Sequence, residues 1–193
     1  SHLGTNELMA TAIQSAAKKT GMPDGVFSAL VGEGATLGQD LAKNDGIKAI
    51  GFTGSFRAGM SLFKTATNDR KTPIPVYAEM SSINPVLLFP GKLAENPAAL
   101  AQQIAGSITL GVGQFCTNPG LLFLVKDEYG DTFTAALKTA LEAIPAGTML
   151  NQGICSSYYR DRHKIAAVSG VTVLLEGANE SGNYKGSPAL LQV

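Results

Sequence analysis

The apolar stretch "IKAIGFT", residues 47–53, constrains the fold more than any other feature of the chain. A nearly continuous apolar run of this length is typical of a β-strand that is buried on both faces. Gly54 and Ser55 follow it directly, a helical pattern continues through Phe63, and "IPVYAEM" at residues 74–80 is the next apolar run. A strand, a helix and a second strand in this order predict a βαβ unit and a parallel sheet.

Strands and helices are expected to alternate along the rest of the chain, which predicts an α/β fold. The 193 residues are 45% hydrophobic, enough for a real core. Thr5 is the expected N-cap of the first helix, and Asn96 opens a later one. Further expected elements are strands at residues 26–31, 84–91 and 121–125, helices at 37–43, 97–112, 131–144 and 158–168, and strand-like runs after 171. The chain starts in a helix and ends on an apolar run, so we expect the natural polypeptide to continue.

The charge balance and the cysteine count exclude several function classes. Fifteen basic and fifteen acidic residues cancel, and no basic cluster is interleaved with aromatic residues, so no nucleic acid partner is expected. The apolar runs fall far short of the ~18 residues of a membrane helix, and no signal pattern opens the chain. We therefore expect a cytoplasmic protein without membrane contact. The two cysteines, Cys116 and Cys155, lack metal-ligand spacing, so reduced thiols and no metal are expected.

The junction "GFTGSFRAG", residues 51–59, offers an anion site at the carboxyl end of its strand. Free N–H groups and the positive end of a helix dipole would point beyond Gly54 and Ser55. The spacing from Gly54 to Gly59 does not match the G-x-G-x-x-G dinucleotide fingerprint. A tight turn without a ligand is the commoner explanation of such a junction, so both interpretations stay open at this point.

Glu79 lies at the carboxyl end of an apolar strand. A carboxylate there is costly unless it is paired or functional, and burial would raise its pKa toward the range of a general base. A glutamate that bonds to backbone at a strand end is the simpler alternative. Ligands of open parallel sheets gather outside the carboxyl ends of the strands. Thr53, Gly54 and Glu79 would then share one crevice.

Cys116 lies in the turn-rich stretch "GVGQFCTNPG", residues 111–120. A free cysteine is more often a small buried hydrophobe than a nucleophile, because thiolate formation needs a polar or electropositive setting. Gln114, Thr117 and Asn118 make this setting polar, and exposed backbone amides in such a loop are able to bind an oxyanion. Packing and nucleophilic chemistry therefore both remain possible for this thiol.

Three motifs in order, "GFTGS", "AEMSSINPV" and "GQFCTNPG", together closely resemble the aldehyde dehydrogenase superfamily over essentially the whole chain. The resemblance implies part of a Rossmann-like, parallel-sheet NAD(P)-binding domain at residues 1–79 and part of an α/β catalytic domain at 80–193. It also implies a central fragment of a longer chain that forms a homo-oligomer when complete. "AEMSSINPV" with "GQFCTNPG" most resembles the bacterial branch acting on α-ketoglutaric semialdehyde (2,5-dioxopentanoate), which often uses NADP.

The resemblance also implies roles for individual residues. Cys116 would attack an aldehyde, with its backbone N–H holding the oxyanion, and hydride transfer to the nicotinamide would leave a thioester. Glu79 would then activate water to release the acid. The residues implied to contact the cofactor, NADP or NAD, are Thr53, Gly54, Ser55, Gly59 and Met80. This cofactor chemistry needs no metal ligand.

The sequence departs from the family pattern in two respects. Ser81 and Ser82 stand where many members have two glycines, which removes some backbone freedom. The family's oxyanion-binding asparagine and ribose-binding lysine lie outside the sequence, so the fragment alone is expected to be inactive. Two alternatives remain: a catalytically inert fragment, and a cofactor-independent cysteine acyl-transfer hydrolase, for which neither His2 nor His163 has a persuasive setting. Cys155 is interpreted as structural.

Overall fold

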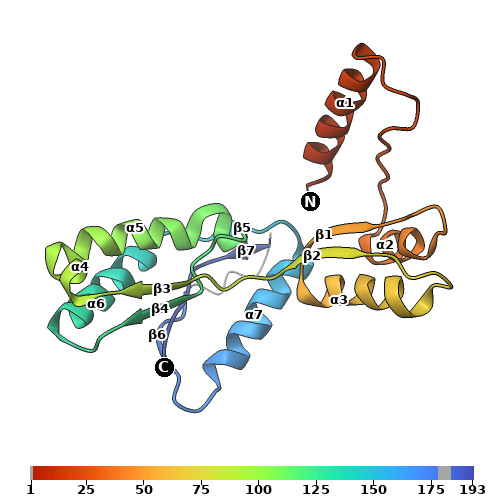
Figure 1. Ribbon diagram of the computed structural model, residues 1–193. Helices are drawn as coiled ribbons and strands as arrows, with labels where there is room; N and C mark the ends of the chain where they lie inside the picture. The colour runs from red at the N-terminus through yellow and green to blue at the C-terminus, as the bar shows by residue number, and fades with distance from the viewer. Residues whose placement is uncertain (1, 178–183) are drawn as a thin grey trace. The chain divides into compact units, whose positions relative to one another are not determined.

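The computed structural model describes residues 2–177 and 184–193 (Figure 1). The chain divides into two compact units, Ser1–Ser81 and Ser82–Val193. Helices and strands are mixed along it, and two of the strand pairs are parallel, which confirms the α/β class expected from the sequence. Of the helices in the two described ranges, none combines the length and the apolar character needed to cross a bilayer.

The first unit is built on two parallel strands that pair directly, and the chain forms a helix on its way from the first strand to the second, as the sequence predicts (Figure 1). The helix begins after Ser55, whose side chain caps it. The elements of the unit are α1 (Leu3–Lys19), α2 (Gly34–Lys43), β1 (Ile50–Gly54), α3 (Phe56–Lys64), the π-helical turn η1 (Thr65–Asp69) and β2 (Val76–Met80).

The two faces of the β1–β2 pair differ in burial. Phe52 and Met80 lie toward α3, where the Met80 side chain packs against the buried Gly59 and leaves no room for a side chain at this position. Thr53 and Glu79 alternate to the opposite face and are exposed. The expectation that this strand is buried on both faces is therefore wrong, since the described residues of this unit cover only one face.

Two further predictions for the first unit are wrong. Residues 26–31 form no strand, because no other strand of the described chain offers them a hydrogen-bond ladder. Helix α1 begins before Thr5, and its N-cap is His2, whose ring Nδ1 accepts a hydrogen bond from the Thr5 N–H at 3.3 Å. The helix expected at 37–43 is confirmed within α2.

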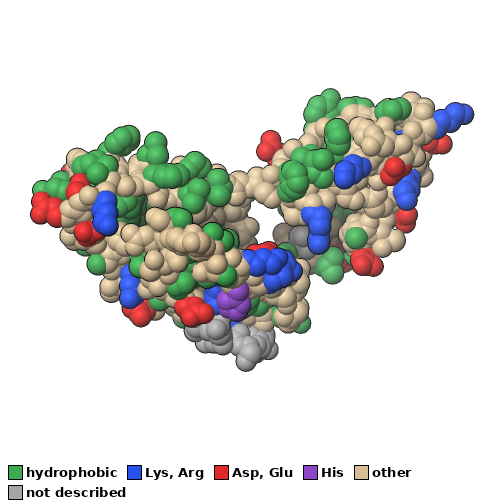
Figure 2. All heavy atoms as spheres, turned by 90° about the horizontal axis from the view of Figure 1, so that it is seen from below, with side chains coloured by type: hydrophobic (Ala, Val, Ile, Leu, Met, Phe, Trp, Pro, Cys, Tyr) green, Lys and Arg blue, Asp and Glu red, His purple; other side chains and the backbone are tan. Residues whose placement is uncertain are grey.

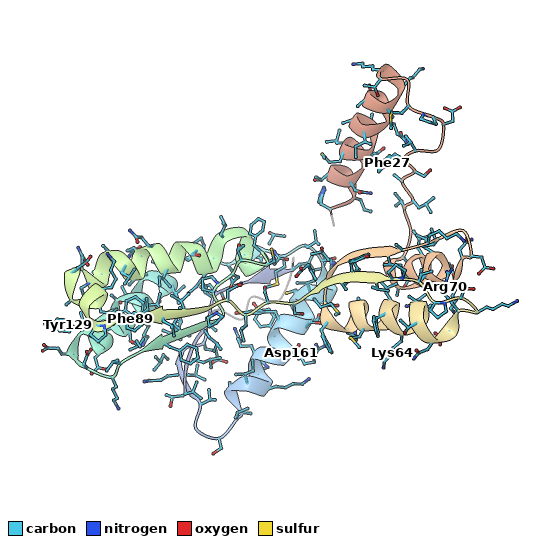
Figure 3. All side chains as sticks on the ribbon, viewed as in Figure 1. Phe27, Lys64, Arg70, Phe89, Tyr129 and Asp161 are labelled. Carbon is cyan, nitrogen blue, oxygen red and sulfur yellow. The ribbon has the colours of Figure 1, made fainter. Side chains whose placement is uncertain are left out.

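Arg70 joins the end of α2 to the segment that leads into β1. Its Nη1 donates to the carbonyl oxygens of Ala42 at 2.6 Å and Asn44 at 2.7 Å, and its Nη2 donates to the Ile47 carbonyl at 3.1 Å. The carbonyls at the end of a helix lack partners within the helix. The Arg70 guanidinium, labelled in Figure 3, supplies those partners and fixes the turn.

Among its described residues the second unit has one parallel strand pair, β3–β4, and two antiparallel pairs, β5–β7 and β6–β8. Its elements are β3 (Pro85–Leu88), α4 (Pro90–Glu95), α5 (Pro97–Thr109), the 3₁₀ turn η2 (Leu110–Gly113), β4 (Leu121–Leu124), α6 (Glu128–Glu142), β5 (Gly147–Thr148), α7 (Gln152–Ala166), β6 (Thr172–Leu175), β7 (Lys185–Gly186) and β8 (Leu190–Gln192).

The core of the second unit lies between α4, α5, α6 and one face of the β3–β4 pair. Phe133 of α6 and Leu93 of α4 are fully buried, and Leu88 of β3 joins the same cluster. Leu87 and Phe123 are register partners on the other face, and both are exposed. Figure 2 shows hydrophobic side chains at the surface of both units, with acidic and basic side chains interspersed.

The helix starts in the second unit follow their capping residues. Asn96 caps α5 as predicted, accepting a hydrogen bond from the Ala99 N–H at 2.9 Å. Helix α6 begins earlier than expected because Asp127 caps it, and α7 begins earlier because Asn151 caps it. Helix α4, with Pro90 in its first turn, was not expected. Of the strand-like runs expected after 171, the part at 178–183 lies outside the described residues.

Candidate active site

Thr53 and Glu79 lie side by side near the carboxyl ends of β1 and β2. They are direct register partners in the parallel pair, and both are exposed on the same face of the sheet. The structure therefore brings these two predicted site residues together, and Gly54 and Ser55 follow Thr53 without interruption. The burial expected for Glu79 is wrong, because its side chain alternates to the uncovered face of the pair.

The turn from β1 into α3 is capped by two serine hydroxyls. Ser55 Oγ accepts a hydrogen bond from the Ala58 N–H at 3.3 Å, and Ser81 Oγ accepts one from the Phe56 N–H at 3.2 Å. Two of the N–H groups that we expected to be free are thus occupied. No sequence pattern indicates the Ser81 contact, because 25 residues separate its two partners.

The same turn has features that suit part of a dinucleotide. The N-terminal end of α3 carries the positive end of a helix dipole, which favours phosphate oxygens. Thr53, Gly54 and Ser55 are exposed beside it. Gly59 is buried against Met80, so a ligand reaches Gly59 only if the Met80 side chain moves. Thr53, Gly54 and Ser55 therefore fit a cofactor contact better than Gly59 does.

Cys116 lies in an exposed turn between η2 and β4, and its thiol is free. Across the described ranges no group accepts a hydrogen bond from the Cys116 N–H. The preceding turn is strained, because Val112 has a positive φ of 59°, which is unusual for a β-branched residue. An exposed thiol beside a free backbone donor is an arrangement that supports nucleophilic attack on a carbonyl.

Side chains on either side of Cys116 anchor this loop. Gln114 accepts a hydrogen bond from the Leu150 N–H through Oε1 at 2.9 Å and donates to the Gly111 carbonyl through Nε2 at 2.9 Å. Asn118 Nδ2 donates to the carbonyl of Ile108 at the end of α5. The sequence identified Gln114 and Asn118 only as polar neighbours. Their partners are 36 and 10 residues away, beyond the reach of a local pattern.

A cavity of about 600 Å³ lies in the second unit against the residues that flank Cys116. Gln114, Asn118 and Tyr158 contribute polar atoms to its wall, while Val112 and Met149 contribute apolar ones. Cys116 is not among the lining residues. The cavity therefore adjoins the base of the loop and not the thiol itself.

Cys155 is a free thiol like Cys116, but it differs from Cys116 in burial and in the hydrogen bond of its sulfur. It is buried in α7, and its Sγ donates to the Lys185 carbonyl at 3.5 Å, in agreement with a structural interpretation. His163 is exposed on the same helix. Within the described part of the chain no group of three or more histidine, cysteine or acidic residues could hold a metal ion.

Two ionisable groups of α7 have displaced pKa values. Burial raises the pKa of Tyr158 above its ordinary value, against the opposing effect of Arg162. Its hydroxyl donates to the Ser187 carbonyl at 2.6 Å. A hydrogen bond from Arg160 lowers the pKa of Asp161 to about 2. Asp161, labelled in Figure 3, is exposed, so salt screens this interaction.

Comparison with known proteins places these features in one family. The sequence matches the model of the Aldehyde dehydrogenase family over residues 4–177. It is 48% identical over 192 residues to alpha-ketoglutaric semialdehyde dehydrogenase 2 of Azospirillum brasilense, which covers 100% of this chain and 36% of the relative. It is 38% identical to alpha-ketoglutaric semialdehyde dehydrogenase of Acinetobacter baylyi, with 99% and 36% covered.

The fold agrees with this match. The crystal structure of an NAD-dependent aldehyde dehydrogenase from Sinorhizobium meliloti superposes with a TM-score of 0.74 and 24% identity, over 97% of this chain and 37% of that one. This chain thus spans little more than a third of the length of the relatives it matches. The motifs, the fold and the sequence matches agree, and the chain belongs to the aldehyde dehydrogenase family.

Proposed function

We propose that the full-length protein oxidises an aldehyde to a carboxylic acid with NAD(P)+ through a thioester on Cys116. The observation that carries this proposal is the exposed Cys116 thiol in an anchored loop, beside its own N–H, to which no group in residues 2–177 and 184–193 offers an acceptor, in a chain of this family. Such a thiol is placed to reach a carbonyl carbon, and the N–H is placed to meet the oxygen that becomes charged.

In the proposed reaction the Cys116 thiol first loses its proton to solvent. The thiolate Sγ then forms a bond to the aldehyde carbon, and the carbonyl oxygen becomes an oxyanion that the Cys116 N–H stabilises. NAD(P)+, when bound, supplies the acceptor for the hydride that leaves this carbon, and the adduct thereby becomes a thioester. Glu79 takes a proton from water as the water attacks the thioester carbon. The carbon–sulfur bond then breaks, which releases the acid and the Cys116 thiolate.

Thr53, Gly54 and Ser55 are the residues that we assign to the NAD(P)+ contact. They are exposed at the carboxyl end of β1, beside the N-terminal end of α3. Gly59 and Met80 remain predicted cofactor contacts. Because the Met80 side chain packs against Gly59, the cofactor reaches Gly59 only if that side chain moves. Residues 1–79 accordingly belong to the proposed cofactor-binding part and residues 80–193 to the proposed catalytic part.

We propose 2,5-dioxopentanoate as the substrate and 2-oxoglutarate as the product. Support comes from the two relatives, both of which are named as alpha-ketoglutaric semialdehyde dehydrogenases. The identity of 48% extends over the whole of this chain, including both the Glu79 and the Cys116 segments.

The test is an assay of acid formation by the full-length protein with NAD+, with NADP+ and without nucleotide. Pentanal is the matched aldehyde, because it has the same chain length and lacks the keto and carboxylate groups. We expect kcat/KM for 2,5-dioxopentanoate to exceed that for pentanal by at least ~100-fold, since polar groups of a substrate allow strong discrimination. Equal values would refute the substrate assignment. Cofactor-independent ester hydrolysis without aldehyde oxidation would indicate a cysteine hydrolase instead.

The role of Glu79 has a separate test. In E79Q we expect the thioester on Cys116 to accumulate, because attack by water loses its general base. Mass spectrometry of the Cys116 peptide after rapid quenching measures this species. Release of the acid at the wild-type rate in E79Q would refute the base assignment and leave the nucleophile assignment intact.

A further inference from the structure

The short segment Ser82–Asn84, which precedes β3, donates hydrogen bonds to the backbone of the cysteine loop, the turn around Cys116 between η2 and β4. Asn84 Nδ2 donates to the Cys116 carbonyl at 2.7 Å and to the Asn118 carbonyl at 2.9 Å, and Ser82 Oγ also donates to the Cys116 carbonyl. The Cys116 carbonyl therefore accepts from two side chains, and both come from a segment 32 to 34 positions away in the sequence.

Backbone contacts hold the same segment against the far end of the loop. The Gly120 N–H donates to the Ile83 carbonyl at 2.7 Å. A Cβ atom at Gly120 would lie 2.8 Å from that oxygen, so only glycine permits the approach. Asn84 itself has a positive φ of 46°, a conformation that asparagine adopts more readily than most residues. The half-buried amide of Asn84 thus stands at a fixed point between Cys116 and Asn118.

We propose that Asn84 and Ser82 are positioning residues that aim the Cys116 thiol, an inference that rests on the proposed function of Cys116. Two donors on one carbonyl fix the peptide plane after Cys116, and this limits rotation about the bond between Cα and the carbonyl carbon. The direction of the side chain and the position of the N–H then vary less. Both are the groups that the proposed attack on an aldehyde uses.

The two serines that stand in place of the family's glycines, Ser81 and Ser82, each make a side-chain contact. Ser81 Oγ meets the start of α3, and Ser82 Oγ meets the Cys116 carbonyl. A glycine at position 82 cannot make the second contact, because the donor is the side-chain hydroxyl.

Asn84 and Asn96 use different atoms of their side-chain amides, so the same substitution affects their hydrogen bonds differently. Asn84 acts through its NH₂ group, so Asn84→Asp replaces a donor with an acceptor that faces two carbonyl oxygens. Asn96, the N-cap of α5, acts through its oxygen, so Asn96→Asp keeps the contact. The change from Asn to Asp therefore removes the hydrogen bonds of residue 84 and keeps the N-cap hydrogen bond of residue 96. Asn84→Gly removes the donor without adding charge and tolerates the positive φ.

The experiment combines hydrogen–deuterium exchange with single-turnover kinetics on the full-length wild type, N84D, N84G and the control N96D. We expect exchange in the peptide covering 114–120 to accelerate at least ~5-fold in N84D and N84G and to stay unchanged in N96D. We expect the single-turnover rate of thioester formation to fall ~10- to 100-fold in both Asn84 variants, with KM for the aldehyde within ~3-fold of wild type.

The two measurements separate this inference from the proposed function. Unchanged exchange in both Asn84 variants overturns the positioning role, whether or not Cys116 is the nucleophile. Faster exchange with an unchanged rate of thioester formation also overturns it, because the loop is then held for another reason. If N84D does not fold, N84G and S82A carry the test, and S82A is expected to give a smaller loss because the Asn84 donor remains.

Discussion

The cysteine loop of the second unit and the strand-to-helix turn of the first unit both carry predicted site residues, yet the chain holds them differently. The loop around Cys116 is anchored from both sides by Gln114, Asn118 and the Ser82–Asn84 segment. Thr53 and Glu79 lie on a sheet face that their own unit leaves open. The backbone of the loop that carries the thiol is therefore held by contacts within the second unit, whereas the proposed cofactor face offers exposed groups to a ligand.

The two units also differ in their cores. The second unit has large side chains with no exposure, such as Phe133 and Leu93, packed around α4, α5 and α6. In the first unit the fully buried side chains are small, Ala42 and Ala66. Truncation of a large buried side chain in the second core should accordingly cost more stability than loss of the Arg70 contacts in the first unit, and the following predictions test this order in the full-length protein.

The largest expected effect comes from Phe133→Ala. The side chain is fully buried, so its removal leaves a cavity and should lower the free energy of unfolding of this domain by ~3–5 kcal/mol. Chemical denaturation measures the change. Phe133→Leu is the matched variant, with an expected loss of no more than ~1.5 kcal/mol. Equal losses for the two variants would show that packing around Phe133 is not what stabilises this core.

Arg70→Met should destabilise the first unit by ~2–3 kcal/mol. The change removes the donors to three carbonyls around the end of α2 while it keeps most of the apolar stem. Arg70→Lys should recover only part of the loss, because an ammonium group cannot reach all three acceptors in a planar fork. Wild-type stability in the Met variant would contradict this assignment.

Tyr158→Phe should cost ~1 kcal/mol at neutral pH, because the hydroxyl donates to the Ser187 carbonyl. Burial raises the pKa of Tyr158 above 10.0, so the folded state favours the protonated form. The contribution is therefore complete below pH 10 and is lost as pH rises through the higher pKa of the folded state. Denaturation between pH 8 and 11 in wild type and Y158F measures it, and parallel curves would contradict it.

The smallest expected effect belongs to Asp161, whose pKa is lowered to about 2 by the hydrogen bond from Arg160. A lowered pKa stabilises the folded state above the ordinary value of 3.8, and this contribution disappears as pH falls toward 2. Because the pair is exposed, molar salt should remove most of the effect. NMR titration of the carboxyl carbon at low and high salt follows it, and a salt-independent pKa would contradict screening.

The sequence predicted those parts of the fold that depend on local patterns. The β1–α3–β2 order and the Asn96 cap follow from apolar runs and capping residues, and the expected proximity of Thr53 and Glu79 follows from the shared edge at the carboxyl ends of parallel strands. The strand predicted at residues 26–31 is wrong, because a strand needs a neighbouring strand to complete its hydrogen bonds, and an apolar run alone does not supply one. The early starts of α6 and α7 were missed because Asp127 and Asn151 were not recognised as caps.

In the candidate site, too, local sequence patterns identify individual residues but not the contacts between distant segments. Cys116 and Glu79 were found through motifs, and the exposure of Cys116 agrees with a chemical role. Ser82 and Asn84 were part of a quoted motif, but their donors meet Cys116 across more than thirty residues, a distance that no local spacing reveals. The cytoplasmic location and the homo-oligomer remain predictions from composition and resemblance.

The most direct measurement compares Cys116→Ser with Cys155→Ser in the full-length protein, using the absorbance of reduced nicotinamide during aldehyde oxidation. The two residues are the only cysteines in the chain, one exposed and one buried. We expect C116S to lose at least ~1,000-fold in kcat, as for other covalent nucleophiles, and C155S to stay within ~3-fold of wild type. Turnover in C116S within ~10-fold of wild type would contradict the assignment of Cys116 as the nucleophile.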